Sequence, residues 1–305
     1  MKAATLHRLM LAGEVLFYLL IGFVTVTRLG WLPRQAVGLA MVLAVLGRAV
    51  IIATTFLFSR LYAAAPPPGC AIGVGRGIAM ALRELAAFTV LFSAVMPFEG
   101  LLMRGDRLGR REDGRPPLLL VHGYQCNRGF WIWLRRRMEQ AGWQAATISL
   151  APVFGDIDGY VEQLERRIDE VCQAAGSERL VLVGHSMGGL VSRAYLRARG
   201  SGKVARLVTL GSPHHGSRLA LLGMGENARQ MIPESGWLAG LNAPGAAPLP
   251  AAAASIYSCQ DNYVMPQDSP RLDGAREVPL PSIGHLEMAF SPEIARRLLE
   301  ELERA

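Results

Sequence analysis

Hydrophobic positions divide the chain into two parts with different patterns. The first hundred residues hold two long apolar runs, at 9–27 and 36–58, and a weaker third run at 80–103. Each of the first two is long enough to cross the hydrocarbon core of a bilayer as a helix. A second apolar run follows the first directly, which is typical of an uncleaved anchor and not of a signal peptide. We therefore predict an all-α transmembrane region over residues 1–104, with two spans and a candidate third.

Two charged residues interrupt the first two runs, Glu14 in one and Arg48 in the other. If the runs pack as an antiparallel hairpin, the two residues differ in depth by about 7 Å at 1.5 Å rise per residue, within reach of an arginine. Ionisable groups inside a span are costly and are usually paired. We predict a structural ion pair, which Glu84 could join from the third run. A transport path would need more polar groups than these spans contain.

From about residue 115 the pattern changes to short apolar runs that alternate with amphipathic segments. Residues 160–175 have apolar positions three or four apart, as a helix with one buried face requires. Six segments are typical of strands: PLLLVHG, AATISL, RLVLVGHS, RLVTLGS, SIYSCQD and AREVPL. Alternating strands and helices predict an α/β domain over 115–305, a parallel sheet covered on both faces. Functional sites of such sheets lie at the carboxyl ends of the strands.

Composition supports the membrane part and argues against nucleic acid. Hydrophobic residues make up 51% of the chain and charged residues 19%, which is unusually apolar for a soluble protein. The net charge of +7 comes largely from two short basic runs, at 104–113 and 134–138. Neither run is interleaved with aromatic residues or lies in a nucleic-acid-binding motif. Basic residues beside a span more often face anionic lipid or set the topology.

The four cysteines form no recognisable pattern. They are scattered, without a C-x-x-C pair or a His/Cys cluster: Cys70, Cys126, Cys172 and Cys259. We expect neither a disulfide framework nor a zinc site, and interpret them as incidental thiols. The redox compartment stays open.

The stretch LVLVGHSMGGL carries the strongest chemical signal. Gly184, Ser186 and Gly188 fit G-x-S-x-G, between a strand pattern and a helix pattern. This is the context of a nucleophile elbow, a tight strained turn that holds a serine hydroxyl above the sheet edge. We predict Ser186 as a nucleophile.

A serine hydroxyl needs a base, and the base needs an orienting carboxylate. In enzymes with this elbow the acid follows the serine and the histidine follows the acid. His285 follows the last strand pattern and is the predicted base. His214 and His215 come before any candidate acid strand, so we interpret them as loop residues near the site.

Asp261 directly follows the strand pattern SIYSC and is the predicted acid. Asp268 and Asp273 lie further along, in a proline-rich loop, and we expect them to be solvated.

Acyl transfer also requires donors for a developing oxyanion. The backbone N–H after the nucleophile, that of Met187, is one predicted donor. The loop after the strand PLLLVHG supplies the other, which we assign to Tyr124. His122 is then a structural residue of that loop and not a second base.

From about Pro116 onward the chain resembles the α/β-hydrolase superfamily, in particular bacterial lipases and related lipid-ester hydrolases. The resemblance rests on ordered motifs: LLLVHGY, VFGDIDGYVEQL, VGHSMGGLVSRAYL, LVTLGSPHHGS, SIYSCQDNYVMP and IGHLEM. The segment ARQMIPESGWLAGLN resembles the cap of that group, and the N-terminal helices lie outside the resemblance. It implies a doubly wound, mostly parallel sheet with a cap insertion. Some relatives bind structural calcium, but no matching aspartate pair is present, so we expect no metal and no other cofactor.

These patterns together predict a membrane-anchored serine hydrolase for carboxylic esters, with lipids as substrates. Residues 212–250, rich in Gly, Ala, Pro and Leu, form a long insertion that we interpret as a lid or as an ordinary cap over a small-ester pocket. A thioesterase, an acyltransferase or a non-catalytic membrane-anchored binding module are the alternatives.

The side of the membrane depends on the number of spans. Basic residues after the third run favour a cytoplasmic hydrolase. With three spans and a cytoplasmic hydrolase, the N-terminus with Lys2 and Arg8 would lie outside, which the same rule disfavours. With two spans, the N-terminus and the hydrolase would both be cytoplasmic, which agrees with the rule. We expect a multi-pass protein of a bacterial inner membrane, with the side of the hydrolase and the oligomeric state left open.

Overall fold

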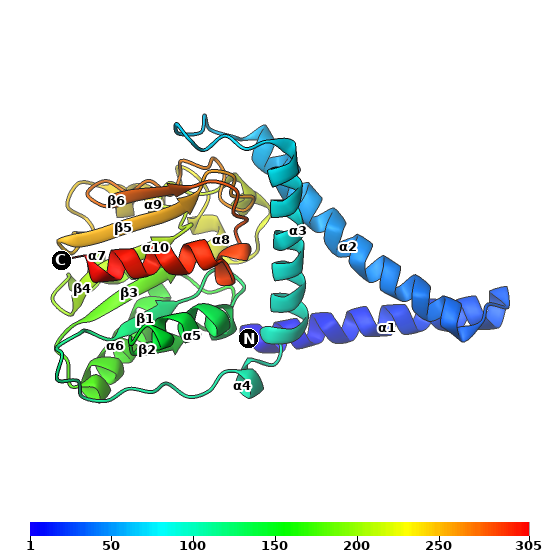
Figure 1. Ribbon diagram of the computed structural model, residues 1–305, viewed down its shortest axis with the longest axis horizontal. Helices are drawn as coiled ribbons and strands as arrows, with labels where there is room; N and C mark the ends of the chain where they lie inside the picture. Colours follow the sequence, from blue (N-terminus) through cyan, green and yellow to red (C-terminus); the bar gives the residue numbers. More distant parts are fainter. Residues whose placement is uncertain (305) are drawn as a thin grey trace.

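A six-stranded parallel sheet lies at the centre of the C-terminal two thirds of the chain (Figure 1), in a computed structural model that describes residues 1–304. Its strand order is β2-β1-β3-β4-β5-β6, and every neighbouring pair is parallel. The strands are β1 (Leu118–Val121), β2 (Ala145–Ile148), β3 (Leu180–His185), β4 (Val204–Leu210), β5 (Ala252–Ser258) and β6 (Arg276–Leu280). Four lie within the segments predicted from sequence, and β4 and β5 overlap theirs but begin two and three residues earlier, so the predicted sheet is confirmed.

Helices cover both faces of the sheet because alternate strand residues point to opposite sides. Leu118 and Leu120 belong to one apolar core, and Leu119 and Val121 belong to the other. The first core includes α5 (Ile132–Gln140) and α10 (Pro292–Glu303), and the second includes α6 (Val161–Ala175) and α7 (Met187–Arg199). Strands buried on both faces are typical of parallel sheets. The predicted doubly wound architecture is therefore confirmed.

Short helices fill the connections at the carboxyl ends of the strands. Between β4 and β5 the predicted lid segment contains η4 (Arg218–Leu222), α8 (Glu226–Gln230) and α9 (Gly236–Asn242). The other single turns are η2 (Arg128–Trp131), η3 (Asp158–Tyr160) and η5 (Glu287–Ala289). These segments surround the sheet edge where sequence places the site.

Two long helices project from the body as an antiparallel hairpin, α1 (Ala3–Leu29) and α2 (Pro33–Leu61) (Figure 1). A third helix, α3 (Val74–Val90), continues into a π-helical turn, η1 (Leu91–Val95), and lies along the body. The third apolar run thus forms a helix over 74–95 and not 80–103. Pro97 follows the helix and cannot continue it, and the short α4 (Glu99–Leu102) comes after. All three long helices are apolar and long enough to cross a membrane, with mean hydropathies of 2.2, 2.4 and 1.7.

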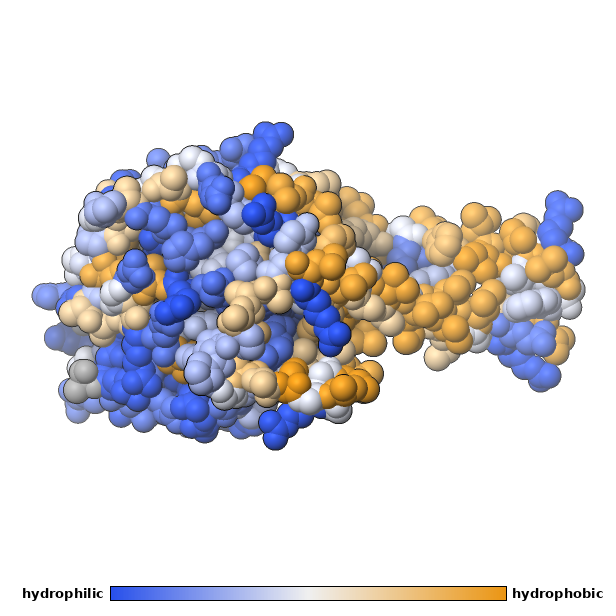
Figure 2. All heavy atoms as spheres, turned by 90° about the horizontal axis from the view of Figure 1, so that it is seen from above, coloured by the Kyte–Doolittle hydropathy of each residue, from blue (hydrophilic) through white to orange (hydrophobic). Residues whose placement is uncertain are grey.

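Apolar side chains cover the hairpin almost entirely (Figure 2). Phe17, Leu20 and Phe23 of α1 are all more than half exposed, as are Val42 and Leu46 of α2. Hydrophilic residues gather at the tip of the hairpin and at the end of the body opposite the hairpin, whereas apolar residues continue onto the body at the base of the hairpin (Figure 2). An exposed apolar surface of this extent is typical of an interaction surface.

The predicted ion pair in the hairpin is confirmed. Arg48 Nη1 lies 2.6 Å from Glu14 Oε1, and Arg48 Nη2 donates to Glu14 Oε2 at 2.8 Å. The expectation that Glu84 joins the pair is wrong. Ser93 of η1 accepts from Arg48 instead, at 2.9 Å, whereas Glu84 points to the opposite side of α3, into the body. One helix face meets the hairpin and the other meets the sheet domain, so the two groups lie on different faces.

The expectation of unpaired thiols is wrong for two of the four cysteines. Cys70, in the linker between α2 and α3, is bonded to Cys259, which follows β5. The pair is separated by 189 residues, so no local spacing in the sequence signals it. Cys126 and Cys172 are free and buried. The disulfide ties the linker to the strand end that precedes Asp261.

Candidate active site

Ser186 occupies the tight turn predicted from sequence, directly between β3 and α7. Its backbone has φ 53° and ψ −126°, a strained region for a residue with a side chain. A Cβ on Gly188 would overlap the carbonyl oxygen of Val121, and one on Gly184 would overlap the backbone of Gly189. The two glycines are therefore required by close backbone approach.

Asp261 and His285 meet at the carboxyl end of the sheet. Asp261 Oδ2 lies 2.7 Å from His285 Nδ1, and both side chains are buried. The other carboxylate oxygen accepts the backbone N–H groups of Tyr263 and Val264, at 2.8 Å each. These two bonds fix the carboxylate, so its free oxygen faces the imidazole.

The electrostatics of His285 are those of a usable base. Burial by itself lowers the pKa of His285, but the charge and the hydrogen bond of Asp261, together with the charge of Glu84, more than offset burial, so its pKa is raised above the ordinary value. With Nδ1 donating to the carboxylate, Nε2 is the ring nitrogen left to accept a proton. Among residues 1–304, no protein group is hydrogen-bonded to Nε2.

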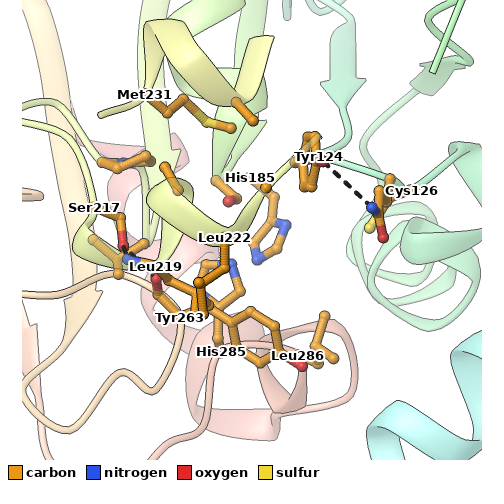
Figure 3. Close-up of a pocket in the computed structure, with 18 of the residues that line it drawn as sticks. Tyr124, Cys126, His185, Ser217, Leu219, Leu222, Met231, Tyr263, His285 and Leu286 are labelled. Atoms are coloured by element: carbon orange, nitrogen blue, oxygen red, sulfur yellow. Dashed lines mark hydrogen bonds between the residues drawn. The ribbon is translucent and has the colours of Figure 1, made fainter. Parts of the chain in front are cut away.

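Ser186 and His285 line the same cavity, whose volume is about 280 Å³. Figure 3 shows His285 among the residues around it. No hydrogen bond joins the two side chains in the described part of the chain. In ligand-free sites such bonds are often long and tighten only when substrate binds. The residues that sequence predicted as nucleophile, acid and base are thus brought to one cavity, with the acid behind the base.

The predicted oxyanion donors flank the serine. Met187 is the first residue of α7, and N–H groups in the first turn of a helix lack an intrahelical acceptor. Tyr124 lines the cavity, and a Cβ on the preceding Gly123 would lie 2.8 Å from the Cβ of Ser186. The loop after β1 therefore passes directly against the elbow.

The cavity wall is mostly apolar. Leu219 and Leu222 line it from the lid segment (Figure 3). Met224 of the same segment and Phe92 of η1 also line it. Leu222 and Met224 are also 70% and 59% exposed, so they form the rim as well as the wall. The Tyr124 hydroxyl donates to the carbonyl of Met224 at 2.7 Å and accepts its N–H at 2.9 Å, which fastens the rim to the loop after β1.

The other buried histidines stay neutral. His122 bonds the carbonyl of Gly123 through Nδ1 and accepts the N–H of Leu150 through Nε2. Burial lowers its pKa to about 4, so it braces its loop and is not a base. His214 and His215 do not line the cavity: His214 is buried beside Thr209, and burial lowers its pKa well below the ordinary value.

Sequence reasoning missed two residues of the site. The ring of His185 stacks on Phe130, with centroids 3.9 Å apart, and lies 4.6 Å from the ring of His285. Asn262 accepts the backbone N–H of His285 at 3.1 Å and donates to Thr55 of α2 at 2.8 Å. No sequence signal marked His185, because it occupies a position that G-x-S-x-G leaves unspecified. For Asn262 the available signal was its place directly after the predicted acid.

Asp268 and Asp273 are exposed, as expected. Within residues 1–304, no three His, Cys, Asp or Glu side chains are grouped closely enough to hold a metal ion.

Known proteins resemble parts of this chain. Residues 155–238 match a family model described as "PGAP1-like alpha/beta domain". A triacylglycerol lipase of Burkholderia plantarii is 33% identical over 142 residues, which cover 42% of this chain and 39% of the lipase. A triacylglycerol lipase of Pseudarthrobacter phenanthrenivorans is 33% identical over 114 residues, 35% of either protein. The chain thus matches well under half the length of these lipases.

The fold also matches solved structures. A lipase of Bacillus licheniformis superposes with a TM-score of 0.57 at 20% identity, covering 65% of this chain and 96% of that one. Lipase B of Aspergillus fumigatus gives 0.58 at 18% identity, covering 65% and 54%. The chain has the α/β-hydrolase fold, and part of its sequence is similar to lipases, as the sequence motifs implied.

Proposed function

We propose that the chain is a membrane-anchored serine hydrolase that cleaves carboxylic esters of lipids. The single observation that carries the proposal is the 2.7 Å bond between Asp261 and His285 at the wall of the cavity that Ser186 also lines. A buried carboxylate bonded to one imidazole nitrogen leaves the other nitrogen to act on a serine hydroxyl.

In the proposed reaction Ser186 attacks the acyl carbonyl while His285 takes its proton through Nε2. Asp261 holds the imidazole in the required tautomer and stabilises the imidazolium that forms. The N–H groups of Tyr124 and Met187 bind the oxyanion of the tetrahedral intermediate. His285 returns the proton to the departing alcohol. Water, activated by the same imidazole, then releases the acid and restores the serine.

The lining of the cavity supports a lipid acyl group as the substrate part that it binds. Polar groups are few apart from those assigned to the chemistry, and the wall is built from leucine, methionine and aromatic side chains. A volume of about 280 Å³ is near the lower end for ligand pockets. Leu222 and Met224 form an exposed apolar rim, so displacement of η4 would enlarge the cavity and present it to a lipid surface.

For the anchor we propose that α1 and α2 span the membrane, and that α3 holds the hydrolase domain against the hairpin. Arg83 of α3 bonds Glu287 and the carbonyl of Ser282, both in the hydrolase domain, and Glu84 is buried there as well. A helix whose central charges bind a polar loop is not free to lie in hydrocarbon. Two spans place the first turn of α1 and the hydrolase domain on the same side. In accord with this, His7 Nε2 lies 2.7 Å from the carbonyl oxygen of Gln125.

Labelling with a fluorophosphonate tests the nucleophile. We expect full-length protein in isolated membranes to react, and Ser186→Ala and His285→Ala to lose the reaction. Ser192→Ala is the matched control, since Ser192 is also buried on α7 but bonds only the carbonyl of Gly188. Esterase activity should fall about 10³-fold or more in the first two variants. A series of p-nitrophenyl esters of increasing chain length then measures the acyl preference.

Each alternative has its own outcome in these assays. Faster turnover of acyl thioesters than of matched esters would favour a thioesterase, and transfer to an added alcohol over water would favour an acyltransferase. A folded wild type that stays unlabelled in both lipid and detergent would overturn the proposal and favour a non-catalytic binding module.

A further inference from the structure

A carboxylate from the anchor region reaches the loop of the candidate base. Glu84, in the middle of α3, is completely buried. Its Oε1 accepts the backbone N–H of Leu286 at 3.0 Å, and its Oε2 accepts that of Glu287 at 2.8 Å. Those are the two peptide groups that follow His285. α3 runs along the edge of the body at this point (Figure 1).

The loop is shaped to receive this carboxylate. A Cβ on Gly284 would overlap Glu84 Oε2 and would also lie 2.9 Å from Glu84 Cβ. Only a glycine therefore leaves room for the side chain beside His285. Gly284 has no positive φ, so close approach and not backbone conformation requires the glycine here.

A second charged residue of α3 fixes the same loop from outside. Arg83 Nε lies 2.5 Å from Glu287 Oε1, and Glu287 Oε2 accepts the N–H of Gly284 at 2.9 Å. Arg83 and Glu287 hold the loop through the N–H of Gly284, before His285, and Glu84 holds it through the two N–H groups after His285. Adjacent residues of one helix thus hold both sides of the segment that carries His285.

Burying an ionised carboxylate is costly unless hydrogen bonds compensate it. Glu84 forms no ion pair in the described part of the chain, and its bonds to the two peptide N–H groups offset only part of the cost, so burial raises the pKa of its carboxyl to about 7. An apolar side chain would fill this space without that cost but would leave both N–H groups unbonded. The position of the carboxylate is therefore explained by the peptide groups after His285.

The backbone N–H of His285 itself bonds a side chain, that of Asn262. Asn262 in turn receives its orientation from Thr55 of α2. The bonds that hold this backbone thus come directly from α3 in one case, and from a residue that contacts α2 in the other. Asp261 restrains the ring alone.

We propose that Glu84 is a positioning residue for His285: it fixes the peptide groups that follow the base, so that docking of α3 sets the angle of the imidazole toward Ser186. The inference rests on the proposed function, because it assigns a role to His285 as base. It makes the anchor region part of the catalytic arrangement as well as an attachment to the membrane.

Glu84→Gln is the test, with Glu301→Gln as the matched control. The amide that replaces the carboxylate has one oxygen for two N–H donors, so one peptide group loses its bond. Glu301 is also a buried carboxylate, but it pairs with Arg276 at the start of β6, the opposite end of the sheet from the site. We expect kcat per folded molecule to fall about 10–100-fold in Glu84→Gln with KM within twofold, as a small misplacement of a catalytic group does. Glu301→Gln should keep both values.

Folded protein is counted by its thermal transition in detergent, and competent sites by fluorophosphonate titration. A wild type that is never labelled would refute the proposed function and not the role of Glu84 alone. A labelled wild type with an unchanged kcat in Glu84→Gln would overturn the positioning role. The positioning role would also be overturned if, after correction for the folded fraction, Glu84→Gln lost no more kcat than Glu301→Gln.

If Glu84→Gln does not fold, Glu84→Asp decides the question. It keeps the charge but is too short to reach both N–H groups. A reduced kcat per titrated site at unchanged KM supports the proposal, and wild-type kcat overturns it.

Discussion

Replacement of Asp261 by asparagine gives the sharpest test of the site, because the carboxylate accepts three hydrogen bonds that one amide cannot accept. Two come from the N–H groups of Tyr263 and Val264, at 2.8 Å each, and one comes from His285. An amide has a single oxygen. It can face the two backbone donors or the imidazole, but not both.

The first orientation is favoured. With the oxygen on the imidazole, the amide NH₂ faces two buried N–H donors and both lose their bond. With the oxygen on the backbone, only the bond to His285 changes. The difference is two buried hydrogen bonds, at about 1–3 kcal/mol each, which corresponds to a preference of roughly 30-fold or more. In the preferred orientation NH₂ donates to Nδ1 of His285, so the imidazole proton moves to Nε2, where the base must be free.

The second loss is electrostatic, since a neutral amide no longer stabilises the imidazolium. Together these effects predict a fall in kcat/KM of about 10⁴-fold for Asp261→Asn. The assay is hydrolysis of a short p-nitrophenyl ester by the full-length protein, with Asp268→Asn as control because Asp268 is exposed. Fluorophosphonate labelling should slow in parallel.

The pH profile gives a second readout of the same change. His285 must be neutral to act, so activity falls as the pH drops through the pKa of His285. Asp261 raises that pKa, so the acidic limb of the wild type should lie above the ordinary imidazole value of about 6.5. In Asp261→Asn burial remains and the carboxylate is gone, so the limb should move to lower pH. Retention of kcat/KM within tenfold, or a larger loss in Asp268→Asn, would refute the assignment.

Two further predictions concern the anchor. Arg48→Met leaves the Glu14 carboxylate unpaired in an apolar hairpin and should destabilise the protein by about 3–5 kcal/mol. The double variant with Glu14→Leu should recover most of that loss. Thermal unfolding in lipid nanodiscs measures both variants, and additive losses would contradict the pairing. The disulfide between Cys70 and Cys259 is typical of an oxidising compartment, so we expect the hydrolase domain on the extracytoplasmic side, against the charge rule, which with two spans favours the cytoplasmic side. Thiol-blocked membranes should give a reductant-sensitive gel shift that Cys70→Ser abolishes, and full alkylation of Cys70 without reductant would count against that side.

The strands, the elbow and the order of the candidate residues were determined by the sequence itself. Strands buried on both faces appear as short apolar runs, and a turn that crowds its backbone requires glycines at fixed offsets, as Gly184 and Gly188 show. Asp261 and His285 were found because each lies in the loop that follows a strand, and the carboxyl ends of the two strands lie at the same sheet edge. The pairing of Glu14 with Arg48 followed from helical rise alone. All of these depend on local pattern or on chain order.

The tertiary structure alone decided what joins the anchor region to the site. The bond from Glu84 to Leu286 connects residues 202 apart, and the disulfide connects residues 189 apart. Sequence assigned Glu84 to the wrong partner because a pattern shows that a charge lies in a helix but not which face meets which neighbour. That choice depends on how α3 packs between the hairpin and the sheet domain. Packing is a property of the whole fold, since the free energy of burying a carboxylate depends on every donor that surrounds it.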